Sequence, residues 1–285
     1  METVQMSNIR EVKQVVNGLK ASDGDGVQLT RIIGSPDLNA LDPFLLLDAF
    51  GSDQPQDYIG GFPSHPHRGF ETVTYMLAGK MRHKDNAGNE GVIEPGGVQW
   101  MTAGKGIIHS EMPEQEDGLL AGFQLWVNLP AKDKMTEPKY QERIAEEIHQ
   151  EIRDDGSKLK VIAGTTEQGT EGVIQNEFVN PIYWDVELPA KVNFTDVVTE
   201  GHNAFIYVIE GQVKIGTAEH QINSGQLAVL DDGNQVSVFS NEASRFLLIA
   251  GKPIGESIER AGPFVMNTKA EIQQAFRDYH TGRFA

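Results

Sequence analysis

The sequence predicts an all-β fold: two tandem barrels or sandwiches followed by a short C-terminal helix. Short runs rich in valine, isoleucine, tyrosine and phenylalanine recur along the chain, and thirty glycines supply turns between them. The two halves of the chain also share one arrangement of strands and turns, as expected for sandwich or barrel folds. The clearest runs are ETVTYML (71–77), GFQLWVNL (122–129), NAFIYVIE (203–210), QLAVL (226–230) and RFLLIAG (245–251).

The internal duplication indicates two copies of one small barrel. In the first half, TYMLAGKMRH turns at Gly79, and a later strand begins after Gly97; in the second half, IYVIEGQVKI turns at Gly211, and the matching strand follows Gly225. A polar segment with two prolines, LPAKDKMTEPKYQER (129–143), separates the halves and is interpreted as a linker. We therefore expect an N-terminal domain over residues 1–135 and a C-terminal domain over residues 136–285.

One helix is predicted near the C-terminus. Thr268 precedes Glu271 by three residues, the spacing of a capping box in which each side chain bonds to the other's backbone N–H. The helix that begins there is expected to run through about Tyr279.

Composition and charge exclude several classes of function. The 285 residues include no cysteine, which rules out disulfides, thiolate nucleophiles and cysteine-ligated zinc or iron–sulfur sites. With 24 basic and 41 acidic residues the net charge is −17, which disfavours direct binding to nucleic acids and to anionic membranes. The apolar runs are too short to span a membrane, and METVQMSNIREVKQ lacks the apolar core of a signal peptide. A cytoplasmic protein is expected.

Two pairs of polar residues form a candidate metal site. His65 and His67 lie in SHPHRGFET, and His109 and Glu111 lie in KGIIHSEM. Residues two apart on a strand point to the same face, so each pair can direct both side chains into one barrel. Three imidazoles and a carboxylate suit a divalent first-row metal: iron, nickel, copper, manganese or zinc. Gly106 allows a tight turn shortly before His109.

The motifs HPHRGFETVTYML (65–77) and GVQWMTAGKGIIHSE (97–111) resemble the metal-binding motifs of the pirin family, within the cupin superfamily. The resemblance extends to DPFLLLDAFG (42–51), GFQLWVNLP (122–130) and GPFVMNT (262–268), and so covers nearly the whole chain. It implies two cupin barrels of jelly-roll type, with one metal ion per chain, Fe(II) in the family, in the N-terminal barrel. The implied ligands are His65, His67, His109 and Glu111.

The carboxylate ligand has one alternative. Other cupins take their carboxylate from the first motif, and Glu71 lies four residues after His67, on the same face of an extended strand. The pirin pattern uses the glutamate two residues after the third histidine, which is Glu111. We expect Glu111 to be the ligand and Glu71 to orient a ligand histidine.

The second barrel is expected to have lost the site. When the turns of the two halves are matched, no metal-ligand set stands opposite the first barrel's candidates; the matched residues are Val197, Thr199, Asn203, Ser237 and Phe239. The remaining histidines receive no functional assignment. His202 has no second ligand nearby, and a surface position is expected for His83, His149, His220 and His280.

Resemblance to bacterial pirins implies quercetin 2,3-dioxygenase activity, in which dioxygen opens a flavonol ring with loss of carbon monoxide. Glu111 would accept the flavonol hydroxyl proton. Trp100 and Trp126 flank the site in sequence and either pack in the core or form an apolar wall for a planar phenolic substrate. The alternative function is a non-catalytic, iron-binding, redox-responsive module that acts on a protein partner.

Overall fold

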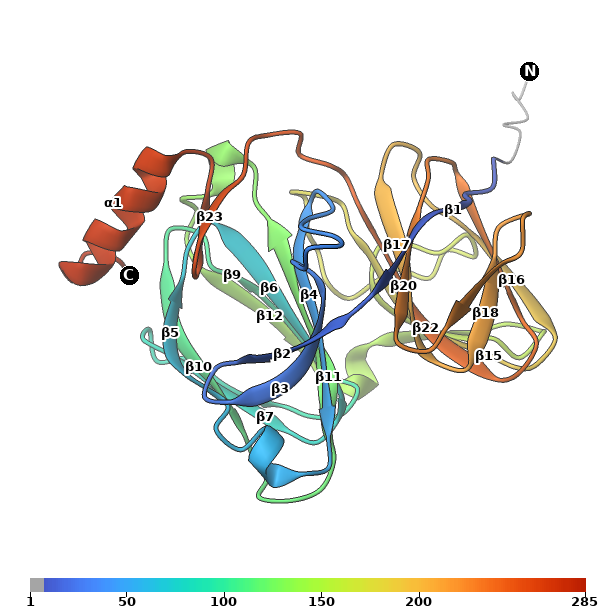
Figure 1. Cartoon of the computed structure of the whole chain (residues 1–285), viewed down its shortest axis with the longest axis horizontal. Helices are drawn as coiled ribbons and strands as arrows, with labels where there is room; N and C mark the ends of the chain where they lie inside the picture. Colours follow the sequence, from blue (N-terminus) through green and yellow to red (C-terminus); the bar gives the residue numbers. More distant parts are fainter. Residues whose placement is uncertain (1–7) are drawn as a thin grey trace. The chain divides into compact units, whose positions relative to one another are not determined.

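Strands make up most of the regular structure in the computed structural model, which describes residues 8–285, and one α-helix ends the chain (Figure 1). The all-β prediction with a C-terminal helix is confirmed. The chain groups into two units: an N-terminal barrel of residues 19–147 and 254–285, and a C-terminal barrel of residues 8–18 and 148–253. No helix in the described part of the chain is long and apolar enough to cross a membrane.

The N-terminal barrel consists of a seven-stranded sheet in the order β12-β9-β6-β11-β4-β3-β2, a four-stranded sheet in the order β5-β10-β7-β8, and a hairpin of β23 and β24. Its strands are β2 (Leu19–Asp23), β3 (Val27–Ile33), β4 (Phe44–Ser52), β5 (Phe62–His67), β6 (Phe70–Ala78), β7 (Met81–Asp85), β8 (Glu90–Ile93), β9 (Val98–Thr102), β10 (Ile107–Pro113), β11 (Leu120–Asn128), β12 (Lys139–Arg143), β23 (Glu259–Ala261) and β24 (Phe264–Met266). It also contains the 3-10 turns η1 (Pro55–Asp57), η2 (Ala131–Asp133) and η3 (Ala145–Glu147), and helix α1 (Lys269–His280).

The C-terminal barrel repeats this plan, with a seven-stranded sheet in the order β1-β20-β17-β22-β15-β14-β13 and a four-stranded sheet in the order β16-β21-β18-β19. Its strands are β1 (Val12–Asn17), β13 (His149–Ile152), β14 (Lys158–Ala163), β15 (Ile182–Leu188), β16 (Val192–Val197), β17 (Asn203–Glu210), β18 (Gln212–Ile215), β19 (His220–Asn223), β20 (Gln226–Leu230), β21 (Gln235–Ser240) and β22 (Ser244–Gly251). The matching sheets confirm the predicted duplication.

Apolar side chains from both sheets fill the C-terminal barrel. Trp184 and Phe246 from the larger sheet pack in one cluster with Phe194 and Val238 from the smaller sheet. In the N-terminal barrel an apolar cluster that includes Met76 and Met81 occupies only part of the interior. The cavity in the rest of the interior has a largely apolar lining that also includes His65 and His67 of β5 and Glu111 of β10.

The alternation of β10 explains why this strand carries a site. Its side chains alternate between buried and half-buried, so that Ile107, His109 and Glu111 face inward while Ile108 and Ser110 do not. This is the period of two expected for a strand with one face on the barrel interior. The prediction that His109 and Glu111 share a face is therefore confirmed.

Two segments belong to the unit that is distant from them in sequence, residues 8–18 and residues 254–285. β1 pairs with β20 of the C-terminal barrel, and residues 254–285 belong to the N-terminal barrel. The expected linker is also partly a strand, because β12 pairs with β9 and extends the seven-stranded sheet. The division at residue 135 into contiguous domains took no account of these long-range pairings, and it stays a prediction.

Helix α1 begins where its sequence predicts. The Thr268 side chain accepts a hydrogen bond from the Glu271 backbone N–H, and Glu271 Oε2 accepts one from the Asn267 backbone N–H at 3.1 Å.

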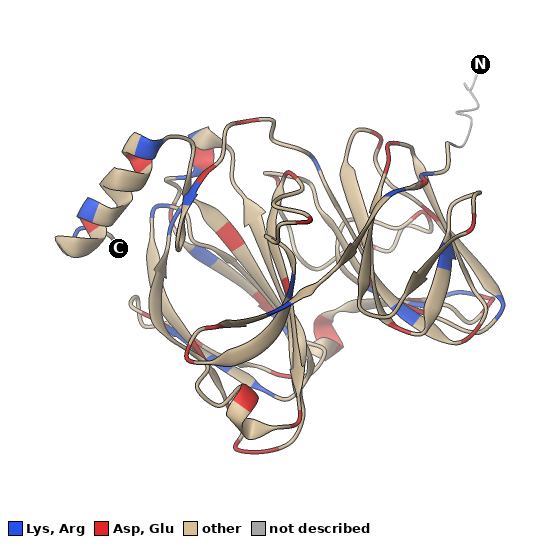
Figure 2. Cartoon of the chain, viewed as in Figure 1, with Lys and Arg blue, Asp and Glu red and all other residues tan. Residues whose placement is uncertain are grey.

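Acidic and basic residues are interleaved along the strands and loops of both barrels (Figure 2).

Candidate metal centre

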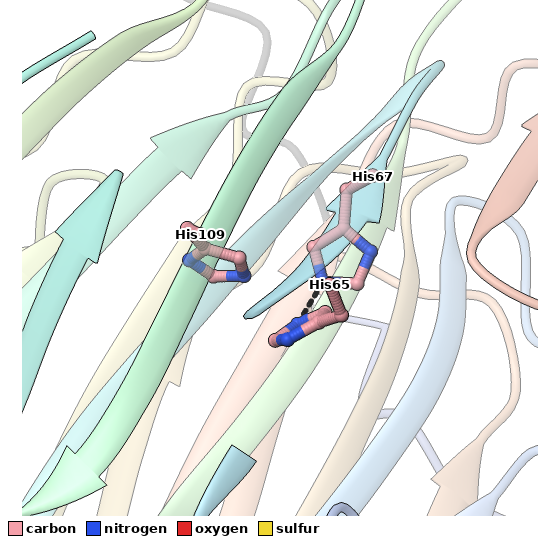
Figure 3. A group of neighbouring side chains, drawn as sticks. All are labelled: His65, His67 and His109. Carbon is pink, nitrogen blue, oxygen red and sulfur yellow. Dashed lines mark hydrogen bonds between the residues drawn. The ribbon is translucent and has the colours of Figure 1, made fainter. Parts of the chain in front are cut away.

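Three histidines from two neighbouring strands converge inside the N-terminal barrel (Figure 3). β5 and β10 pair in antiparallel fashion with His65 directly opposite His109, and His67 lies two residues further along β5. Each histidine offers one ring nitrogen to a common point, and these nitrogens all lie within 4.8 Å of one another. Among residues 8–285 this is the group of histidine and acidic residues that could hold a metal ion.

The spacing of the histidines fits a metal ion. Nε2 of His65 and Nε2 of His67 are 3.0 Å apart (dashed line in Figure 3). Metal–nitrogen bonds of about 2.1 Å at right angles would place two ligand nitrogens about 3 Å apart. His65 Nδ1 donates to the Pro63 carbonyl at 2.8 Å, which assigns the proton to Nδ1 and leaves the Nε2 lone pair facing His67.

Burial leaves the triad with unsatisfied groups. His109 is 1% exposed, and neither of its ring nitrogens has a hydrogen-bond partner among the described residues. A buried polar atom without a partner is costly, and a bound cation would satisfy one of them. Burial, together with the neighbouring histidines, also lowers the pKa of His67 and of His109 well below the usual value. Both rings are therefore neutral near pH 7, the form that binds metal.

Glu111 lies in the same interior but is held by other residues. The Thr74 hydroxyl donates to its Oε1 at 3.0 Å, and Gln124 Nε2 donates to its Oε2 at 3.5 Å. Burial raises the pKa of the Glu111 carboxyl. The structure groups the three histidines without Glu111, so its role as fourth ligand stays a prediction. Glu71, the alternative, is buried elsewhere and accepts a hydrogen bond from the Thr102 hydroxyl at 2.7 Å.

His65 and His67 of the triad line a cavity of about 500 Å³, a volume within the range of small-molecule sites. Trp126 is one of its walls and packs against Phe70 at 4.3 Å and edge-on to His67 at 5.3 Å between ring centres. Trp100 is 1% exposed and does not line this cavity, so it belongs to the core. The lining residues are Asp23, Gly24, Leu29, Leu46, Asp48, Phe50, Phe62, Pro63, His65, His67, Thr74, Met81, Glu111, Gln124, Trp126, Arg260, Gly262 and Pro263.

His83 is a site neighbour that the sequence analysis misplaced on the surface. It is 4% exposed, and β7 pairs with β10 so that His83 lies directly opposite Glu111. Its Nε2 is 2.7 Å from Glu142 Oε2, and this contact lowers the pKa of the Glu142 carboxyl. The signal was present in MRHKD (81–85), since His83 alternates with the apolar Met81 and therefore shares its inward face. The three other expected surface histidines are exposed: His149, His220 and His280.

The C-terminal barrel has an apolar interior at the matching strands. β16 pairs with β21, as β5 pairs with β10, and Thr195 lies opposite Ser237. Ser237 is only half-buried and alternates with the buried Val236 and Val238, whereas His109 is buried on the inward face of β10, so the predicted match of Ser237 with His109 does not preserve the inward face. The inward residues of these strands, such as Phe194 and Val236, belong to the apolar core.

Two cupin barrels, one of which carries a histidine triad beside a cavity, define a bicupin. Family comparison matches residues 26–127 to the Pirin family and residues 183–285 to the Pirin C-terminal cupin domain. A pirin-like protein of Caulobacter vibrioides is 53% identical over 97% of this chain and 99% of its own length. The chain therefore belongs to the pirin family.

Solved structures agree with this assignment. A quercetin 2,3-dioxygenase from Acinetobacter baumannii is 37% identical, with a TM-score of 0.89 over 98% of this chain and 99% of the other. A bacterial pirin from Escherichia coli, solved in complex with nickel(II), is 20% identical, with a TM-score of 0.65 over 84% of this chain and 98% of the other. The latter likeness shows the shared fold alone.

Proposed function

We propose that the protein is a metal-dependent dioxygenase that cleaves a flavonol such as quercetin, consuming one dioxygen and releasing one carbon monoxide per flavonol. The observation that carries the proposal is the histidine triad, two of whose members, His65 and His67, line a largely apolar cavity with an aromatic wall. The quercetin 2,3-dioxygenase from Acinetobacter baumannii, similar along nearly its whole length, supports the substrate class.

Each site residue has a distinct part in the proposal. His65, His67 and His109 would hold a divalent metal, Fe(II) by the protein's likeness to pirins, with nickel, copper, manganese or zinc as the other candidates and Glu111 as the fourth ligand. The metal would supply a Lewis acid that favours the deprotonated flavonol, and open positions for substrate and dioxygen. Glu111 would accept the proton of the flavonol 3-hydroxyl, since its carboxylate lines the same cavity. Trp126 would bind the planar rings and exclude water.

Gas exchange by protein of known metal content tests the proposal. Wild-type protein, His109→Ala and the control His220→Ala are mixed with quercetin, and dioxygen uptake and carbon monoxide release are measured. His220 is exposed on β19 of the other barrel, so its replacement should change neither quantity. We expect wild type and control to release one carbon monoxide per quercetin consumed, and His109→Ala to release none.

Wild-type protein that holds metal and consumes no quercetin would contradict the enzymatic proposal. That outcome would favour the redox-responsive module, whose protein partner would then be sought. Equal gas exchange by wild type and His109→Ala would instead show that the reaction does not use this site.

A further inference from the structure

Arg260 reaches the cavity from a segment far along the chain. It lies on β23, and its guanidinium carbon is 4.5 Å from the centre of the Trp126 ring. Arg260, Gly262 and Pro263 line the cavity together with Trp126 and the histidines of β5. An arginine that lies on an indole face is held by cation–π attraction, while its N–H donors point outward in the guanidinium plane.

Two of the three carboxylates that line the cavity, Asp23 and Asp48, are already paired with another arginine. Arg31 donates to both oxygens of Asp48, at 3.0 and 2.7 Å, and to Asp23 Oδ2 at 2.9 Å. Arg260 makes no ion pair within 4.0 Å with a carboxylate in the described part of the chain; Asp48 and Asp23 interact with it at longer range, and its hydrogen bond to the Leu45 carbonyl is 3.4 Å long. The lining therefore contains a positioned cation whose donors are largely uncommitted.

Trp126 lies between this cation and the metal centre. Its ring centre is 4.5 Å from the Arg260 guanidinium carbon and 5.3 Å from the centre of the His67 ring. Arg260 and His67 thus lie against the same indole, and an aromatic ligand of two or three rings is long enough to reach from one to the other. A planar ligand that lies along Trp126 with one oxygen at the histidines brings its far end beside Arg260.

We propose that Arg260 is a specificity-determining residue that binds an ionised phenol hydroxyl on the ring of the substrate remote from the metal centre. A guanidinium presents paired donors that match such an oxyanion, and charge-assisted hydrogen bonds are stronger than neutral ones. The inference rests on the proposed flavonol function and narrows it: polyhydroxylated flavonols are preferred to those without remote hydroxyls.

Two flavonols and three variants test this assignment. Quercetin carries hydroxyls on both remote rings, whereas 3-hydroxyflavone carries only the hydroxyl that would reach the histidines. Metal-loaded wild type, Arg260→Gln, Arg260→Lys and the control Arg277→Gln are compared for kcat and KM with each flavonol. Arg277 is exposed on α1, where it bonds to Gln274.

For Arg260→Gln we expect KM for quercetin to rise about ten- to hundredfold, the usual effect of losing a hydrogen bond to a charged group. Its kcat for quercetin, and both constants for 3-hydroxyflavone, should stay within about twofold of wild type. Arg260→Lys keeps the charge without the paired donors and should be intermediate. Equal losses for both flavonols, or a loss in kcat alone, would overturn the assignment.

Direct binding separates this proposal from the proposed reaction. The dissociation constants of quercetin and 3-hydroxyflavone are measured by calorimetry on metal-loaded protein without dioxygen. One combined result is wild-type protein that binds quercetin selectively without turning it over, with that binding abolished in Arg260→Gln. This combination would refute the dioxygenase activity and support the role of Arg260. Wild-type protein that binds the two flavonols equally, or binds neither, would refute the role of Arg260.

Discussion

Replacing Arg68 with methionine is expected to loosen both strands that carry the candidate ligands, β5 and β10. Arg68 follows His67 directly and is 4% exposed. Its guanidinium donates to the Lys105 carbonyl in the turn before His109, to Asp278 Oδ2 at 2.7 Å and to the Phe284 carbonyl at 3.2 Å. It also lies 4.4 Å from the centre of the Phe284 ring. One side chain therefore ties the end of β5, the turn before β10 and the C-terminal segment together.

The structure sets the size of the effect. Methionine preserves most of the buried volume but leaves the Lys105 and Phe284 carbonyls without this donor. Each buried acceptor left unsatisfied lowers the free energy of unfolding by about 1–3 kcal/mol. The Asp278 side chain is 20% exposed, so water can solvate part of its unpaired charge. Breaking a buried ion pair typically lowers the free energy of unfolding by about 3–5 kcal/mol, and we expect Arg68→Met to lower it by about 3 kcal/mol, at the lower end of this range.

Urea unfolding and metal competition measure the two consequences. Arg68→Met should lower the unfolding midpoint of the N-terminal barrel and weaken metal binding, because the two ligand strands lose a shared tie. Asp278→Asn removes the ion pair but keeps an acceptor, so a smaller loss is expected; it also serves as the readout if Arg68→Met fails to fold. Arg277→Met is the exposed control. Unchanged stability and metal affinity in Arg68→Met would refute this reasoning.

Three further predictions concern the same barrel. His109→Ala should lose metal yet keep its β-sheet circular dichroism at 25 °C, since the apolar clusters remain; an unfolded variant would show that the site is structural. Glu111→Gln should abolish flavonol turnover while Glu71→Gln keeps bound metal by elemental analysis, and the reverse result would reassign the carboxylate. Burial lowers the pKa of Lys134 from its ordinary 10.5 to about 8. Between these two pH values the unfolded chain binds more protons than the folded protein, so the free energy of unfolding rises with pH, by up to about 3 kcal/mol. Lys134→Met should lack this rise in urea titrations at pH 7.5 and 10, and an identical rise would assign it to other groups.

Local patterns in the sequence predicted those parts of the fold that depend on neighbouring residues. The inward face shared by His109 and Glu111 follows from the two-residue period of a strand, and the start of α1 follows from the spacing of Thr268 and Glu271. The same period would have placed His83 inside, had Met81 been read as its inward neighbour. The error came from weighing the polarity of the segment above its alternation.

The sequence by itself therefore determined the strand class, the duplication, the helix and the candidate histidines, because each is written in residues close together in the chain. Only the tertiary structure decided that His65 lies opposite His109, that β1 belongs with the second barrel, and that Arg260 lies on Trp126. These contacts join residues far apart in sequence, and their register depends on how whole sheets pair and pack. No local period encodes that choice.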